Sequence, residues 1–351
     1  MIPIYKPYLP AKSIEYAKDA LDSGWVSSIG EYIERAEIKL AEQTKSKYAI
    51  LVNNGTSATH LCARVLKRWH PNTERVFVPS ACYVAVYNCL MYDQFDWDIQ
   101  PLDLDRDTWN MKLPKSYEPG DALMAVHNVG NVMNLDKVEC PIVEDSCETL
   151  FGCVKQPKSI CASLSFFGNK SMTSGEGGAL VTDDSNVANF IRKLKGQGQT
   201  TTRYVHDELG YNYRMTNVQA ALLLGQLEEW GNIFSGKEHV FKRYNEHFKD
   251  YPSIIPQKVD LVHSRWMYGV RIIGSKKYSD NRDFFAAKGI DTRPMFYPYK
   301  HHKHFEVRAP KSDKVAKQLH KEIVILPSYP ELSDIEIEKI AHAVIKRSKE
   351  V

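Results

Sequence analysis

The chain has 351 residues, of which 43% are hydrophobic and 25% are charged, a composition typical of a folded globular protein. Its 46 lysines and arginines nearly balance 43 aspartates and glutamates, which gives a net charge of +3. This balance argues against a protein that works mainly by neutralising nucleic-acid phosphates, and against an acidic disordered chain. At ~100–200 residues per domain, the length predicts two domains, or one large domain with an appendage.

Cysteine usage and apolar runs bear on where the protein works. The seven cysteines are scattered and no C-x-x-C pair occurs, which argues against a disulfide framework and against a zinc site. The first residues, MIPIYKPYLP, have neither the basic nor the apolar region of a secretory signal. No run approaches the ~18 apolar residues of a membrane span. We therefore expect a soluble cytoplasmic protein with no membrane association and no nucleic-acid partner.

Short apolar runs alternate with helical patterns through the first half of the chain. The elements that we expect, in chain order, are helices at 11–23 and 31–44, a strand at 48–53, a helix at 56–69, a strand at 75–79, a helix at 83–91, strands at 97–101, 122–126, 141–145, 163–167 and 178–183, and helices at 217–229 and 234–249. Such alternation favours a mainly parallel sheet that is covered on both faces. Ligands of such sheets bind at the carboxyl ends of the strands.

The regular alternation of strand and helix patterns ends near Pro252. Apolar strand-like runs and two further helical patterns follow, at 266–273, 281–288, 290–297, 322–328 and 335–345. They predict a smaller α+β domain. We therefore expect a large domain over residues 1–248 and a small C-terminal domain over residues 249–351.

The first chemical motif is a polar turn between an expected strand and an expected helix, NNGTSA at 53–58. A glycine turn that leads into free helix N–H groups suits a phosphate, and the hydroxyls of Thr56 and Ser57 add hydrogen-bond donors. The same residues also make an ordinary helix N-cap. On this motif alone, the N-cap is the better interpretation.

Two more motifs follow expected strands. Asp145 ends an apolar run, where a partly buried carboxylate needs a partner; the alternative is a solvated strand end. Lys170 lies in a loop rich in Gly, Ser and Thr after the strand at 163–167. In a desolvated site a lysine amine becomes nucleophilic, as a Schiff base requires. The alternative is an exposed lysine in a surface hairpin.

Two loops are open to more than one interpretation. The loop GYNYRMTN at 210–217 places polar side chains between and after two tyrosines, which suits the edge of a ligand, although Thr216 also suits a helix N-cap. The segment RPMFYP at 293–298 precedes three histidines, His301, His302 and His304. Their spacing mixes faces and no nearby carboxylate completes a ligand set, so a solvated basic loop is favoured and no metal is expected.

The order of the first three motifs is more informative than any one of them. Pyridoxal phosphate requires a phosphate site, an anion beside its pyridine nitrogen and a lysine that forms a Schiff base. The turn at 53–58, Asp145 and Lys170 supply these three groups. The sequence therefore predicts pyridoxal 5'-phosphate as the cofactor.

Over nearly its whole length the chain resembles the sugar-nucleotide aminotransferases, which are fold-type-I pyridoxal-phosphate enzymes of the aspartate aminotransferase superfamily. The resemblance is carried by SGWVSSIGEYIERAE (23–37), NNGTSA, VPSACYVA, VEDSCE, SFFGNKSMTSGEGGALVTDD, GYNYRMTNVQAALLLGQLE, RPMFYP and LPSYPELSDIEIEKI. Within the family the chain is most similar to 4-aminotransferases of the perosamine and viosamine type. The resemblance implies an α/β protein with the three-layer PLP-transferase fold type I, a mainly parallel central sheet and a smaller C-terminal α+β domain.

The resemblance also implies roles for matching residues. Lys170 is implied as the catalytic lysine, which binds the cofactor and moves a proton between the cofactor and sugar C4. The implied cofactor-binding residues are Thr56, Ser57 and Ser165 at the phosphate, Tyr83 stacked on the ring, Asp145 at the ring nitrogen, Glu148 near the phenolic oxygen, where many members have glutamine, and Asn212 at the phosphate of the neighbouring subunit's cofactor. The role of Asn212 implies a homodimer with shared active sites. Candidates for substrate binding are Trp25, His127, Arg214 and Tyr297.

The implied reaction transfers an amino group from L-glutamate to C4 of a nucleotide-linked 4-keto-6-deoxy-hexose. The product is a 4-amino-4,6-dideoxy sugar of the GDP-perosamine or the UDP- or dTDP-viosamine type. Three alternatives remain: a C3 sugar aminotransferase, a pyridoxal-phosphate sugar dehydratase, whose members replace the lysine, and a non-catalytic nucleotide-sugar sensor. The sequence leaves open the nucleotide and the configuration at sugar C2.

Overall fold

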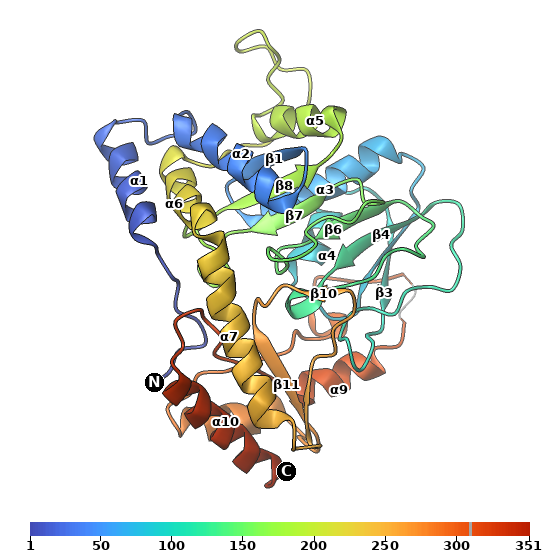
Figure 1. The fold of residues 1–351 in the computed structure, drawn as a ribbon. Coiled ribbons are helices and arrows are strands. Elements are labelled where there is room, and N and C mark those ends of the chain that lie inside the picture. Colours follow the sequence, from blue (N-terminus) through green and yellow to red (C-terminus); the bar gives the residue numbers. More distant parts are fainter. Residues whose placement is uncertain (309–310) are drawn as a thin grey trace.

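The structure, a computed structural model, describes residues 1–308 and 311–351. Within these residues the largest sheet has seven strands in the order β1-β8-β7-β6-β4-β2-β3. The strands are β1 (Tyr48–Val52), β2 (Arg75–Pro79), β3 (Asp98–Leu102), β4 (Asp121–Val126), β6 (Ile142–Asp145), β7 (Ala162–Ser165) and β8 (Gly178–Thr182). The strands from β7 to β3 run parallel, while β8 is antiparallel to both of its neighbours. The mainly parallel sheet predicted from the sequence is confirmed (Figure 1).

Helices cover both faces of this sheet and make the predicted three layers (Figure 1). One face carries α3 (Gly55–Trp69), α4 (Ala85–Met91) and α5 (Ser185–Lys195), and the other carries α1 (Ala11–Asp22), α2 (Glu31–Thr44) and α6 (Asn217–Glu228). Side chains alternate between the layers along each strand. In β1, Ile50 and Val52 pack with the first group of helices, whereas Ala49 and Leu51 pack with the second.

A second sheet, in the C-terminal part, is antiparallel, with the order β12-β13-β11-β9. Its strands are β9 (Ile254–Pro256), β11 (Tyr268–Ile272), β12 (Arg293–Pro294) and β13 (Ile323–Leu326), and its helices are α8 (Tyr278–Ala286), α9 (Lys314–Glu322) and α10 (Asp334–Ser348). The long helix α7 (Trp230–Phe248) leads into this part, and its residues Phe241 and Tyr244 join the same hydrophobic cluster as Ile2. The division at residue 248 stays a prediction.

Short elements connect the two parts. Strand β5 (Asn131–Val132) pairs with β10 (Val262–His263), and the single-turn helices η1 (Asn128–Gly130) and η2 (Tyr299–His301) lie in loops near the carboxyl end of the large sheet. Helices α5 and α9 were not among the predicted elements. The predicted helix at 83–91 begins at Ala85, and the predicted helix at 234–249 begins earlier, at Trp230.

Within the described residues, no helix is long and apolar enough to cross a bilayer. The same residues contain no group of three or more histidine, cysteine, aspartate or glutamate side chains that could hold a metal ion. All seven cysteines lie in the described part of the chain and are free thiols.

Candidate active site

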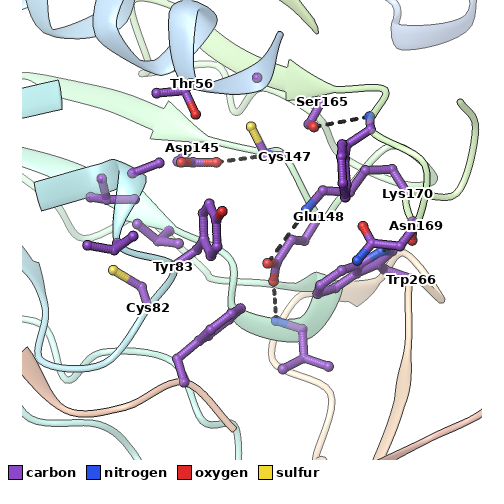
Figure 2. A pocket seen from close by; sticks show the side chains of 18 of the residues that line it. Thr56, Cys82, Tyr83, Asp145, Cys147, Glu148, Ser165, Asn169, Lys170 and Trp266 are labelled. Atoms are coloured by element: carbon purple, nitrogen blue, oxygen red, sulfur yellow. Dashed lines mark hydrogen bonds and ion pairs between the residues drawn. The ribbon is translucent and has the colours of Figure 1, made fainter. Parts of the chain in front are cut away.

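A cavity of about 600 Å³ lies where the strands of the large sheet end and the C-terminal part begins. This volume falls within the ~300–1,000 Å³ typical of small-molecule sites. Asp145 is the last residue of β6 and Ser165 is the last residue of β7, so the cavity occupies the carboxyl edge of the parallel strands, as expected for this kind of sheet. The predicted residues that line it are Thr56, Tyr83, Asp145, Glu148, Ser165, Lys170 and Tyr297 (Figure 2).

The start of α3 forms one wall of the cavity. Asn54 caps the helix, because its side chain accepts a hydrogen bond of 2.8 Å from the Ser57 N–H. Gly55 lies so close to Ser165 that a Cβ at this position would be 2.6 Å from the Ser165 Cβ. Thr56 and Ser165 line the cavity beside this helix N-terminus, an arrangement that suits a phosphate group. Ser57 is buried within α3 and does not line the cavity.

Asp145 supplies a buried carboxylate in the wall of the cavity (Figure 2). It is only 8% exposed, and both of its oxygens are held. The Thr59 hydroxyl donates to Oδ2 over 3.1 Å, and the Cys147 N–H donates to Oδ1 over 3.0 Å. A carboxylate fixed in this way at a cavity wall suits a cationic ring N–H, because buried charges require a partner.

Lys170 and Glu148 face each other across the cavity. The Lys170 Nζ is 3.8 Å from Glu148 Oε1 and 4.2 Å from the centre of the Trp266 ring. The other oxygen of Glu148 accepts a 2.7 Å hydrogen bond from the N–H of Val129, a residue in the left-handed region with φ of 60°. Burial raises the pKa of Glu148 to about 7, although the Lys170 ammonium and the Val129 N–H both act to lower it.

Glu148 should make the stability of the cofactor-free protein depend on pH. Because its pKa is about 7 in the folded state, against an ordinary value of 4.5, the folded protein binds more protons than the unfolded chain between these values. Its contribution to the free energy of unfolding therefore falls as pH rises through this window, by at most ~1.4 kcal/mol per pH unit. We expect Glu148→Gln to remove this fall, as measured by urea unfolding at several pH values.

Glu176→Gln is the matched control for this measurement, because Glu176 is an exposed carboxylate that lines the same cavity. If both variants keep the pH dependence of the parent protein, Glu148 does not carry the proton that its burial implies.

Aromatic residues complete the walls of the cavity. Tyr83, which is 60% exposed, lies with its ring centre 6.2 Å from that of Phe296, and its open face suits a planar ring. Tyr297 packs against His320 with ring centres 3.9 Å apart. His302 also lines the cavity, and burial lowers its pKa.

Besides Ser57, four predicted residues lie outside the cavity. His127 is fully buried next to the large sheet, where its Nε2 lies 2.8 Å from Oε2 of Glu144 in β6. Asn212 and Arg214 are exposed beside the end of β1, and the Arg214 Nε–H donates to Asn212 Oδ1 over 3.1 Å. Trp25 is 60% exposed in the loop between α1 and α2. The roles of these residues stay predictions.

Trp266 and Arg293 line the cavity but were not predicted individually as site residues. Trp266 lies two residues before β11, in the C-terminal part, and no local motif marks it. Arg293 belongs to the RPMFYP segment, which the sequence marks only as a whole.

Comparison with known proteins agrees with this geometry. The model of the DegT/DnrJ/EryC1/StrS aminotransferase family matches residues 7–345. The chain belongs to this family. Its members use pyridoxal phosphate, so the protein is a pyridoxal-phosphate-dependent aminotransferase.

Among its relatives, the GDP-perosamine synthase of Escherichia coli O157:H7 is 34% identical over 361 residues, which cover 98% of this chain and 97% of that protein. The GDP-perosamine synthase of Vibrio cholerae is 32% identical, with 98% of each chain covered. The fold matches Helicobacter pylori PseC, an aminotransferase of pseudoaminic acid biosynthesis, with a TM-score of 0.88 at 21% identity over the whole of both chains. It also matches an E. coli GDP-4-keto-6-deoxy-D-mannose-3-dehydratase, with a TM-score of 0.87 at 19% identity over 98% of this chain and 99% of that one.

Proposed function

We propose that the protein transfers an amino group from L-glutamate to C4 of a GDP-linked 4-keto-6-deoxy-hexose, which gives a sugar of the perosamine type. The observation that supports this most directly is full-length similarity, at 32–34% identity, to GDP-perosamine synthases. Among the nucleotides that the sequence left open, this similarity favours GDP. The cavity agrees with it, because it combines a phosphate cradle, a buried carboxylate and an amine in one space.

The residues that line the cavity fit pyridoxal phosphate. Thr56, Ser165 and the start of α3 would bind its phosphate, Asp145 would hold the proton at the pyridine nitrogen, and the Tyr83 ring would lie against the face of the cofactor. When bound, the cofactor withdraws electrons from the carbon that carries the amino group.

The chain's own residues then handle the protons. The Lys170 amine takes a proton from the α-carbon of glutamate and later delivers one to sugar C4, as general base and general acid. Burial raises the pKa of Glu148 to about 7, so the carboxyl group is protonated below that pH. It can then donate a hydrogen bond where many relatives would use the amide of glutamine. The centre of the Trp266 ring lies 4.2 Å from the Lys170 Nζ, which is the geometry of a cation–π contact.

The presence of Lys170 favours amination over dehydration. The fold alone does not separate these reactions, because aminotransferase and dehydratase structures match it equally well. A dehydratase on this scaffold would replace the lysine, and a non-catalytic sensor would not need Lys170 and Asp145 in the same cavity.

Arg293 and His302 line the cavity and are candidates for binding the sugar diphosphate or the donor carboxylate. The side chain of Arg293 is 54% exposed, and the Nε2 of His302 is buried without a hydrogen-bond partner among the described residues. A guanidinium and an imidazole N–H are the groups that bind such anions.

A substrate panel tests the proposal. GDP-, UDP- and dTDP-linked 4-keto-6-deoxy sugars are supplied with glutamate, and products are read by mass and NMR. We expect amination at C4 with the GDP-linked sugar as the best substrate. A deoxygenated product would instead support the dehydratase, an amine at C3 would support the C3 aminotransferase, and binding without turnover would support the sensor.

We further propose a homodimer with shared active sites, in which Asn212 reaches the partner's cofactor phosphate. The loop between α5 and α6 supports this, because it extends away from the body of the subunit (Figure 1). Two of its large apolar side chains are exposed, Tyr204 at 75% and Leu209 at 77%, and a partner subunit could cover them. Asn212 is exposed at the base of this loop. Mixing Lys170→Ala subunits with Asn212→Ala subunits should restore part of the activity, and no recovery in mixed dimers would contradict shared sites.

A further inference from the structure

Two consecutive backbone carbonyls in the turn that carries Lys170 accept hydrogen bonds from distant side chains. The Trp266 indole N–H donates to the carbonyl of Asn169 over 2.9 Å, and the Tyr5 hydroxyl donates to the carbonyl of Lys170 over 2.6 Å. The turn itself is closed by a 2.9 Å hydrogen bond from the Lys170 N–H to the Phe167 carbonyl. The main chain on the carboxyl side of the turn is therefore held by groups that belong to neither β7 nor β8.

Both donors are anchored to the C-terminal part of the chain. The N-terminal segment that carries Tyr5 pairs with residues 289–291, because the Ile2 N–H donates to the Gly289 carbonyl over 2.7 Å and the Asp291 N–H donates to the Ile2 carbonyl over 2.9 Å. Trp266 lies two residues before β11, which has a neighbour on each side in the small sheet. Lys170 thus lies between two strands of the large sheet, whereas the two side chains that bind its main chain are anchored to the C-terminal part.

Both side chains are also fixed in place. Trp266 is 7% exposed, and its ring packs against the Lys170 Nζ (Figure 2). The Tyr5 ring lies 5.0 Å from the Nζ of the buried Lys237, which donates to the Ser328 carbonyl over 3.0 Å. Burial raises the pKa of the Tyr5 hydroxyl far above its ordinary value, so the hydroxyl remains a hydrogen-bond donor at any working pH.

We propose that Tyr5 and Trp266 form a clamp that positions the main chain of Lys170 for proton transfer. This inference rests on the proposed role of Lys170. The lysine amine lies at the end of a flexible side chain and has to exchange protons with two carbon atoms in succession, the α-carbon of glutamate and sugar C4. Small misplacements of a reacting group slow a reaction strongly. A fixed backbone at Lys170 leaves the side chain as the only part that moves. Tyr5 and Trp266 are therefore positioning residues.

The test removes one hydroxyl. Tyr5→Phe keeps the ring and its packing but leaves the Lys170 carbonyl without its donor. We expect kcat to fall about three- to tenfold, as the loss of one hydrogen bond predicts, while KM for the sugar nucleotide is unchanged. In the cofactor-free protein, amide hydrogen exchange of residues 168–172 should become faster. Trp266→Phe, which removes the other donor, should accelerate the same amides.

Tyr8→Phe is the matched control, since it removes a hydroxyl from the same N-terminal segment without touching the hydrogen bonds of the lysine turn. We expect neither kcat nor the exchange of residues 168–172 to change. If Tyr5→Phe behaves like Tyr8→Phe in both measurements, the clamp does not exist. The exchange readout needs neither cofactor nor substrate, so it separates failure of the clamp from an incorrect assignment of the sugar.

Discussion

Lys170→Ala should abolish transamination and the visible absorbance of the cofactor-loaded protein. Under the proposed function, the substitution removes the amine that would bind the cofactor and the group that would move protons. General acid–base catalysis alone contributes ~10²–10⁴-fold. We therefore expect turnover to fall at least ~10⁴-fold. Because Lys170 lines the cavity and its amine makes only a 3.8 Å contact with Glu148 and a 4.2 Å contact with the centre of the Trp266 ring, the fold should survive. Single-turnover assays and absorbance spectra measure both effects.

Lys112→Ala serves as the control for this change, since Lys112 is exposed and does not line the cavity. It should behave like the parent protein. If the Lys170→Ala protein keeps both the absorbance band and turnover, another residue carries the chemistry and the proposed function is wrong.

Asp145→Asn should produce the second largest loss. Asparagine fits the same space and can still accept from the Cys147 N–H, and the Thr59 hydroxyl can reverse its hydrogen bond to suit the new amide. What disappears is the negative charge that would hold a proton at the cofactor's ring nitrogen. Removal of one preorganised electrostatic partner from an active site costs ~10²–10³ in kcat, and we expect a loss of this size in both half-reactions.

Asp136→Asn is the control for charge alone, because Asp136 is exposed and does not line the cavity. A thermal melt shows whether Asp145→Asn remains folded. Wild-type turnover in a folded Asp145→Asn protein would show that the carboxylate has no electronic role.

The parts of the site that were predicted from the sequence are those that local patterns mark. Gly55, Asp145 and Lys170 each follow an apolar run, and strands that run parallel bring their carboxyl ends to one edge. Residues that directly follow these strands are therefore expected to lie close together in space. This is why three motifs, each weak alone, converge on one cavity.

Tyr5 and Trp266 could not be found in this way. Tyr5 meets the Lys170 carbonyl across 165 residues of chain, and Trp266 meets the Asn169 carbonyl across 97. No periodicity connects such positions, because their contact exists only after the C-terminal part packs on the large sheet. His127 is a different case. Its position in a loop near the site is evident from the sequence, but the sequence does not show that its imidazole points into the interior and contacts Glu144.

The two helices missing from the predictions have local explanations. Helix α5 is capped by Asp184, whose side chain accepts a hydrogen bond from the Asn186 N–H, and this signal was available in the sequence. Helix α9 has nine residues, and Ala316 and Leu319 are its buried apolar side chains. So short an apolar stripe is difficult to distinguish from a charged loop.

The antiparallel pairing of β8 with β7 places Lys170 in a hairpin rather than in a crossover. Ser165 and Gly178 face each other as the last and first residues of adjacent strands, so the intervening segment begins and ends on one pair of neighbours. Its residues can be exchanged without altering how any other strand is connected. In such a scaffold, a substitution at the tip of this hairpin can change the chemistry of the site while the order of the strands stays the same.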